Sequence, residues 1–218
     1  MGFENIKLVI FDLDGTLADT MGDLVVSMNI MLSHYGFPHR TRDDLLRFIN
    51  GGAMNFVRQA LPLDKQSDDE FLREAFGIYN EAYSQHYADT TYLYAGMLDT
   101  VMGLKSAGMK LAVLSNKQHF QTNAIIDKLA PNTFDIVMGH ADLPHKPDPA
   151  TVYHIFDTLG VTAEETLFVG DSDVDIRTAI NSGTYPIGVA WGYRTPELLI
   201  ETGAQMIVYN PMEILELI

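Results

Sequence analysis

With 218 residues, of which 47% are hydrophobic, the chain is long enough to bury a substantial core in one or two domains. The absence of cysteine excludes disulfides and thiolate chemistry, so any metal must be held by oxygen or imidazole. A formal charge of −15 disfavours nucleic acid as a partner, and no apolar stretch approaches the roughly 18 residues that span a bilayer, so we expect a soluble, cytoplasmic protein.

The apolar runs along the chain predict an α/β fold. The first, at residues 6–11, is typical of a strand buried on both faces of a parallel sheet. Similar runs predict four further strands, at residues 110–114, 134–138, 166–169 and 185–189. Helical patterns alternate with them, at residues 97–107, 120–129, 149–159 and 173–182. This alternation predicts an open, Rossmann-like parallel sheet with helices on both faces.

The interval between the first two predicted strands is about 90 residues, far more than one crossover needs. Four helical patterns fill it, at residues 19–35, 43–49, 53–61 and 68–87. We therefore predict a helical cap domain at residues 18–88, inserted into an α/β core of residues 1–17 and 89–218. The cap leaves and rejoins the sheet near one edge, so it can close over a ligand bound there.

Two aspartates, Asp12 and Asp14, follow the first predicted strand and precede Gly15. Carboxylates this close repel each other unless a cation lies nearby, so the pair indicates a functional site. Strand geometry directs both side chains to the same side, and Gly15 permits the sharp turn that follows. A turn with a helix cap would explain one aspartate but not both.

Three further polar segments follow later strands. Ser115 and Asn116 offer a hydroxyl and an amide to phosphoryl oxygens, although Ser115 is also suited to cap a helix. Lys146 precedes the first of two prolines that stiffen its loop, although an ordinary exposed lysine is the alternative. Asp171 and Asp175 are hard oxygen ligands of the kind that Mg²⁺ accepts. All of them lie at the edge where open α/β sheets bind ligands.

Taken in this order, the segments at residues 12–16, 115, 146 and 170–175 resemble the motifs of the haloacid dehalogenase superfamily of phosphohydrolases. The resemblance implies that the five predicted strands lie in the order 3-2-1-4-5 and that the helical cap is inserted early. It also implies a Mg²⁺ cofactor and a small phosphorylated metabolite as substrate.

The resemblance implies a catalytic role for four residues. Asp12 would attack phosphorus to give an aspartyl-phosphate that water hydrolyses, and Asp14 would serve as general acid and then as general base. Ser115 would hydrogen-bond the transferring group, while Lys146 would neutralise it and orient the nucleophile.

The resemblance also implies a metal site. Asp12, the backbone carbonyl of Asp14 and Asp171 would hold Mg²⁺, with Asp175 supporting its water ligands. In the cap, residues 48–61 resemble the loop and helix of the phosphoglycolate phosphatases, which makes Gly51, Gly52 and Arg58 candidate substrate contacts. A plain helix start is the alternative interpretation of this segment.

Several alternatives share this core. Asp14 argues against a 2-haloacid dehalogenase, which lacks the second aspartate. A phosphomutase of the beta-phosphoglucomutase type and an inorganic pyrophosphatase stay open, as does the choice between monomer and homodimer. A receiver-like signalling domain, which also accepts a phosphoryl group on aspartate, is disfavoured by the cap and the chain length.

Overall fold

The computed structural model describes residues 3, 5–49 and 52–218. The chain divides into two compact units, which we call the core and the cap. The core comprises the residues up to Asp19 together with Tyr92–Ile218, and the cap comprises Thr20–Thr91. The cap predicted from the sequence is residues 18–88.

A parallel sheet of six strands, counted over the described residues, forms the centre of the core, in the order β5-β4-β1-β6-β7-β8. Its strands are β1 (Leu8–Phe11), β4 (Lys110–Gln118), β5 (Ile136–His140), β6 (Thr166–Gly170), β7 (Tyr185–Val189) and β8 (Met206–Val208). The first five occur in the predicted order, which confirms the predicted fold class. The edge strand β8 was not predicted.

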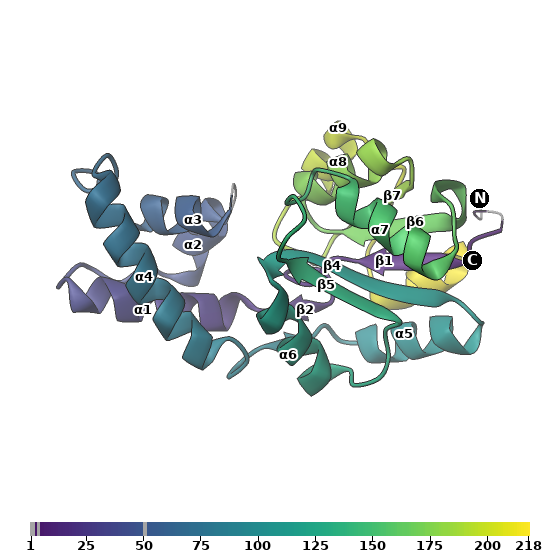
Figure 1. Cartoon of the computed structure of the whole chain (residues 1–218), viewed down its shortest axis with the longest axis horizontal. Coiled ribbons are helices and arrows are strands. Elements are labelled where there is room, and N and C mark those ends of the chain that lie inside the picture. The colour runs from purple at the N-terminus through teal and green to yellow at the C-terminus, as the bar shows by residue number, and fades with distance from the viewer. Residues whose placement is uncertain (1–2, 4, 50–51) are drawn as a thin grey trace. The chain divides into compact units, whose positions relative to one another are not determined.

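Helices cover both faces of this sheet (Figure 1). One face carries α7 (Ala150–Leu159), α8 (Asp173–Ser182) and α9 (Pro196–Thr202), and the other carries α5 (Met97–Ser106) and α6 (His119–Leu129). Two short 3₁₀ helices, Ala163–Glu165 and Pro211–Leu217, complete the core.

The central strand β1 is fully buried because helices pack on both of its faces. Its Leu8 and Ile10 side chains belong to one apolar cluster with Val152 and Ile155 of α7 and with Phe168 of β6. Burying each such side chain contributes about 1.5–3 kcal/mol to folding. This packing fixes β1, and with it the residues that follow the strand.

The chain leaves and re-enters the core through a two-stranded antiparallel ribbon, β2 (Ala18–Asp19) and β3 (Tyr92–Leu93). Asp19 is the partner of Tyr92 in this ribbon, and the Tyr92 hydroxyl donates a hydrogen bond to Asp19 Oδ2 at 3.1 Å. The two ends of the insertion are therefore joined at the core.

The cap consists of α1 (Met21–His34), α2 (Arg42–Phe48), α3 (Ala53–Ala60) and α4 (Asp69–His86). Local signals in the sequence explain where two of these helices begin. The Thr41 hydroxyl accepts a hydrogen bond from the Asp44 N–H while Asp44 accepts from the Thr41 N–H, and the Asp68 carboxylate caps α4. Each cap contributes on the order of 1 kcal/mol.

A buried aspartate joins the two ends of the cap. Asp23 of α1 is fully buried, and its carboxylate accepts four hydrogen bonds from the backbone N–H groups and hydroxyls of Thr90 and Thr91. Their lengths lie between 2.6 and 3.0 Å. The four donors offset the loss of hydration that burial imposes on a carboxylate.

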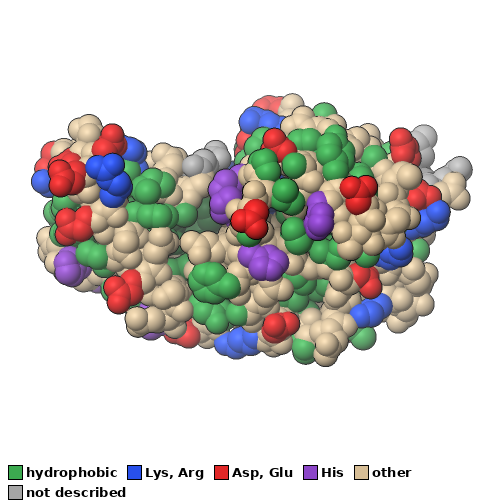
Figure 2. All heavy atoms as spheres, viewed as in Figure 1, with side chains coloured by type: hydrophobic (Ala, Val, Ile, Leu, Met, Phe, Trp, Pro, Cys, Tyr) green, Lys and Arg blue, Asp and Glu red, His purple; other side chains and the backbone are tan. Residues whose placement is uncertain are grey.

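On the face drawn in Figure 2, acidic side chains are spread among hydrophobic and neutral ones. Such dispersed charge favours solubility and does not by itself form a binding site. None of the helices in the described part of the chain is long and apolar enough to span a membrane.

Candidate active site

The register of the sheet brings the ends of three strands together. Phe11 of β1 is the partner of Val113 of β4 and of Val169 of β6. The residues that follow these three therefore lie side by side at the carboxyl edge of the sheet, where open α/β sheets bind ligands.

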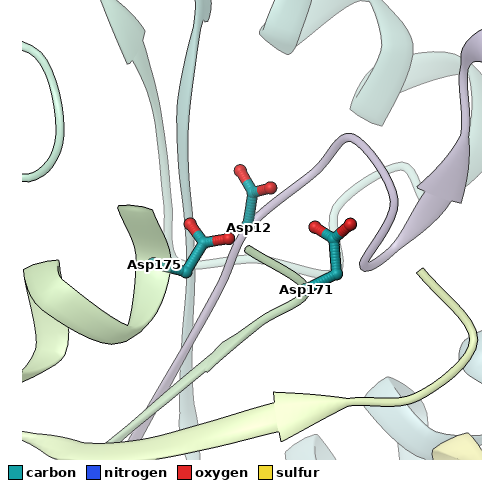
Figure 3. Close-up of side chains that lie close together, drawn as sticks. All are labelled: Asp12, Asp171 and Asp175. Carbon is teal, nitrogen blue, oxygen red and sulfur yellow. The ribbon is translucent and has the colours of Figure 1, made fainter. Parts of the chain in front are cut away.

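Three carboxylates gather at this edge. Asp12 follows β1, Asp171 follows β6, and Asp175 lies in the first turn of α8 (Figure 3). One oxygen from each lies within 4.8 Å of the others, and all three residues are buried. We call Asp12, Asp171 and Asp175 the acid cluster.

Lys146 neutralises part of this charge from the loop before α7. Its Nζ donates to Asp12 Oδ1 at 2.7 Å and to Asp175 Oδ1 at 2.6 Å, and the residue is only 7% exposed. Burial alone would lower the pKa of Lys146, but the two carboxylates raise it above its ordinary value. The lysine is therefore a fixed cation.

The cluster nevertheless holds more negative charge than Lys146 balances. Burial, followed by the charge of Asp175, raises the pKa of Asp12 well above the usual carboxyl range although Lys146 lowers it. The same two causes raise the pKa of Asp171 to about 7. When all three acids are ionised, three carboxylates and one ammonium leave two negative charges, which one divalent cation balances. Buried, hard oxygen donors fit Mg²⁺ in particular.

Close backbone approach and two hydrogen bonds fix Asp171. Gly15 has φ +90°, and a Cβ there would lie 2.3 Å from Asp171 Oδ2, so glycine meets both the conformational and the steric requirement. The Thr16 hydroxyl donates to Asp171 Oδ1 at 3.2 Å, and the Tyr193 N–H donates to Oδ2 at 2.7 Å. Asp171 is thus oriented before any ligand binds.

Asp14 stands apart from the acid cluster. Its Oδ2 accepts a hydrogen bond from the Ser115 hydroxyl at 3.2 Å, and its Oδ1 lies 2.5 Å from Lys117 Nζ. Ser115 and Lys117 are two positions apart on β4, so their side chains project to the same side of the strand. The carboxylate of Asp14 therefore occupies an anion site formed by a hydroxyl and an ammonium.

Asn116 points to the opposite side of β4 and clamps the backbone of Lys146. Its amide nitrogen donates to the Lys146 carbonyl at 3.0 Å, and its amide oxygen accepts from the Lys146 N–H at 2.8 Å. The Lys146–Pro147 peptide bond is cis. The structure thus brings Asn116 to Lys146, and its predicted contact with substrate stays a prediction.

The candidate residues of the cap lie within their own unit. Gly51 falls outside the described residues, and Gly52 is an exposed residue at the start of α3 with φ +86°. Arg58 of α3 donates to the carbonyl of Gln66, and its Nη2 lies 2.9 Å from Asp69 Oδ1. A substrate role for this guanidinium would require it to exchange these partners.

Sequence reasoning did not assign a role to Thr16, Lys117 or Tyr193. Thr16 and Lys117 lie within one or two positions of predicted site residues, so the sequence could have predicted that they lie close to the site. Tyr193 lies 22 residues beyond Asp171 in a loop after β7, and no spacing pattern points to it.

Comparisons with known proteins agree with this geometry. Residues 9–189 match the family described as haloacid dehalogenase-like hydrolase. A phosphoglycolate phosphatase of Pseudomonas savastanoi is 32% identical over 95% of this chain and 80% of its own length. One from Pseudomonas putida is 33% identical over 88% and 74%. The crystal structure of a putative phosphoglycolate phosphatase from Lactobacillus delbrueckii is similar, with a TM-score of 0.90, 28% identity and coverage of 99% and 98%.

Proposed function

This chain belongs to the haloacid dehalogenase-like hydrolase family, and we propose that it hydrolyses the phosphate ester of a small acid, with 2-phosphoglycolate as the first candidate. Its relatives make it a phosphoric monoester hydrolase. The observation that best supports a phosphoryl-transfer site is Lys146, whose ammonium bridges Asp12 and Asp175 beside a third carboxylate.

In the proposed reaction, a carboxylate oxygen of Asp12 forms a bond to phosphorus as the bond to the leaving oxygen breaks. Asp14 gives its proton to that oxygen, which departs as an alcohol. Asp14 then takes a proton from water, and the resulting hydroxide attacks the phosphorus of the aspartyl-phosphate. Inorganic phosphate leaves, and the Asp12 carboxylate is restored.

The other core residues support these reaction steps by supplying charge and by positioning the reacting groups. Lys146 orients the Asp12 carboxylate and offsets charge on the phosphoryl oxygens, while Asn116 holds the lysine backbone. Ser115 offers its hydroxyl to the same oxygens. Asp12, Asp171 and the backbone carbonyl of Asp14 would hold Mg²⁺, which, when bound, offsets the negative charge of the acids and of the phosphoryl group.

A substrate screen tests the proposal. Release of inorganic phosphate should be measured for 2-phosphoglycolate, sugar phosphates, nucleotides and pyrophosphate, with Mg²⁺ and with chelator. We expect Mg²⁺-dependent hydrolysis of 2-phosphoglycolate that the Asp12→Asn variant lacks. Undiminished turnover by this variant, shown to be free of wild-type enzyme, would overturn the proposed nucleophile.

The same screen separates the alternatives. Preferred hydrolysis of pyrophosphate would identify a pyrophosphatase, and an isomeric sugar phosphate formed without free phosphate would identify a mutase. A long-lived acyl-phosphate without turnover would favour the receiver-like alternative. Asp173→Asn is a matched control, because Asp173 lies in the same acidic segment but pairs with Arg177 at 3.2 Å. This control should keep full activity.

A further inference from the structure

Lys117 is a cation in the site that the proposed phosphoryl chemistry does not use. Its side chain is only 7% exposed, and its ammonium lies 2.5 Å from the Asp14 carboxylate, which is 19% exposed. A second lysine, Lys146, already serves Asp12 and Asp175. The site therefore holds two buried ammonium groups, one beside the acid cluster and one beside Asp14.

The Asp14 carboxylate is bound by Ser115 and Lys117 in the way that a protein binds the carboxylate of a ligand. Asp14 receives a hydroxyl from Ser115 and an ammonium from Lys117, and these are the groups that bind a carboxylate well. The Lys117 N–H also donates to Ser115 Oγ at 3.2 Å, which ties the two donors together. Both side chains come from the last part of β4, two positions apart, and both contact the Asp14 carboxylate.

We propose that Lys117 is a specificity-determining residue that binds the carboxylate of a substrate carrying both a phosphate and a carboxylate. The substrate carboxylate would replace that of Asp14 on the ammonium, and Asp14 would turn to face the leaving oxygen. This inference rests on the proposed phosphatase function, and it assigns recognition of the acid group to the core instead of to Gly52 and Arg58 of the cap.

The exchange links binding to catalysis. While Asp14 is paired with Lys117, it is not available to protonate the leaving oxygen. A substrate that brings its own carboxylate satisfies the buried ammonium and releases the Asp14 carboxylate, which takes up a proton from water before it acts as general acid. A phosphate ester without this group leaves the ion pair in place, because breaking it would leave a buried ammonium without a counter-charge. The enzyme should therefore hydrolyse phosphate esters that carry a carboxylate faster than esters that lack one.

A pair of substrates of equal chain length tests the proposal. 2-Phosphoglycolate carries a carboxylate where 2-hydroxyethyl phosphate carries a neutral hydroxymethyl group. We expect the wild-type enzyme to prefer 2-phosphoglycolate in kcat/KM by at least about tenfold, the scale of one charge-assisted hydrogen bond. In the Lys117→Met variant this preference should disappear, through a higher KM for 2-phosphoglycolate and through a higher kcat for 2-hydroxyethyl phosphate, because Asp14 is no longer held by an ammonium.

Three further variants and readouts complete the experiment. Lys117→Arg keeps the charge and should retain much of the preference, while Lys128→Met makes the same change on the exposed part of α6 and should leave the preference unchanged. Thermal unfolding verifies that each variant is folded. Equal losses for both substrates in folded Lys117→Met would overturn the inference, because Lys117 would then act only through Asp14.

Failure of the proposed function gives a different result. If the wild-type enzyme hydrolyses both esters equally well, the phosphatase function stands and the inference about Lys117 falls. If it hydrolyses neither, while the screen identifies another class of substrate, the proposed substrate and the inference both fall.

Discussion

Two buried carboxylate sites in this molecule differ in how their charge is satisfied. In the cap, Asp23 accepts four hydrogen bonds from Thr90 and Thr91. In the core, three carboxylates lie together with one ammonium that bonds two of them, and the pKa values of Asp12 and Asp171 are raised, first by burial. A carboxylate that stabilises a fold finds its donors within the protein, whereas a cluster left with surplus negative charge is arranged to take up a cation.

The largest expected effect is a loss of activity when the ammonium of the core site is removed. Lys146→Met removes the ammonium that Asp12 and Asp175 share, so we expect kcat/KM for 2-phosphoglycolate to fall by at least about 100-fold. Steady-state kinetics measures this loss, with Lys128→Met as a control for removing a lysine from the core. A loss below about threefold would show that Lys146 is not part of the reacting site.

The corresponding change in the cap should affect stability and not metal binding. Asp23→Asn replaces two acceptor oxygens by one and turns an NH₂ group toward donors, so we expect a loss of about 2 kcal/mol in the free energy of unfolding. Urea unfolding measures the loss, with Asp43→Asn on the exposed first turn of α2 as the control. Mg²⁺ should raise the Tm of this variant as much as that of the wild type. If Mg²⁺ no longer raised its Tm, Asp23 would be linked to metal binding, contrary to this prediction.

The pH dependence of Mg²⁺ binding sharpens the comparison. A raised carboxyl pKa in the folded state favours folding at low pH, and this contribution is lost as pH rises from about 4 through 7. Mg²⁺ requires the deprotonated carboxylate of Asp171, so its affinity should rise about tenfold between pH 6 and pH 8. Titration calorimetry measures the affinity. Asp171→Asn should bind Mg²⁺ weakly at both values, and a wild-type affinity independent of pH would refute the assignment.

The smallest expected effect concerns the ribbon that joins the core to the insertion. The Tyr193 hydroxyl lies 3.4 Å from Asp19 Oδ1, a long hydrogen bond, while its backbone N–H holds Asp171. Tyr193→Phe keeps the backbone contact, so we expect activity within about threefold of wild type and a stability loss below about 1 kcal/mol. Tyr92→Phe removes the shorter bond to Asp19 and should lower Tm more. The reverse order would disprove this ranking.

The sequence predicts the five main strands because each is a distinct apolar run, whereas their order is implied by the resemblance to the haloacid dehalogenase superfamily. The strand β8 and helix α9 escape prediction because they are short, with three and seven residues, and carry little periodicity. The acidic and lysine motifs predict which elements meet at the edge of the sheet. They do not predict that Lys117 holds Asp14 or that Tyr193 holds Asp171, since such contacts depend on side-chain direction and loop path.

The two ends of the inserted segment are joined twice, by the pairing of Asp19 with Tyr92 in the core and by the bonds of Asp23 with Thr90 and Thr91 in the cap. A segment closed in this way can be exchanged in evolution for another of different length without shifting the register of β1 against β4. The inserted segment can then change while the core residues that handle the phosphoryl group stay in place.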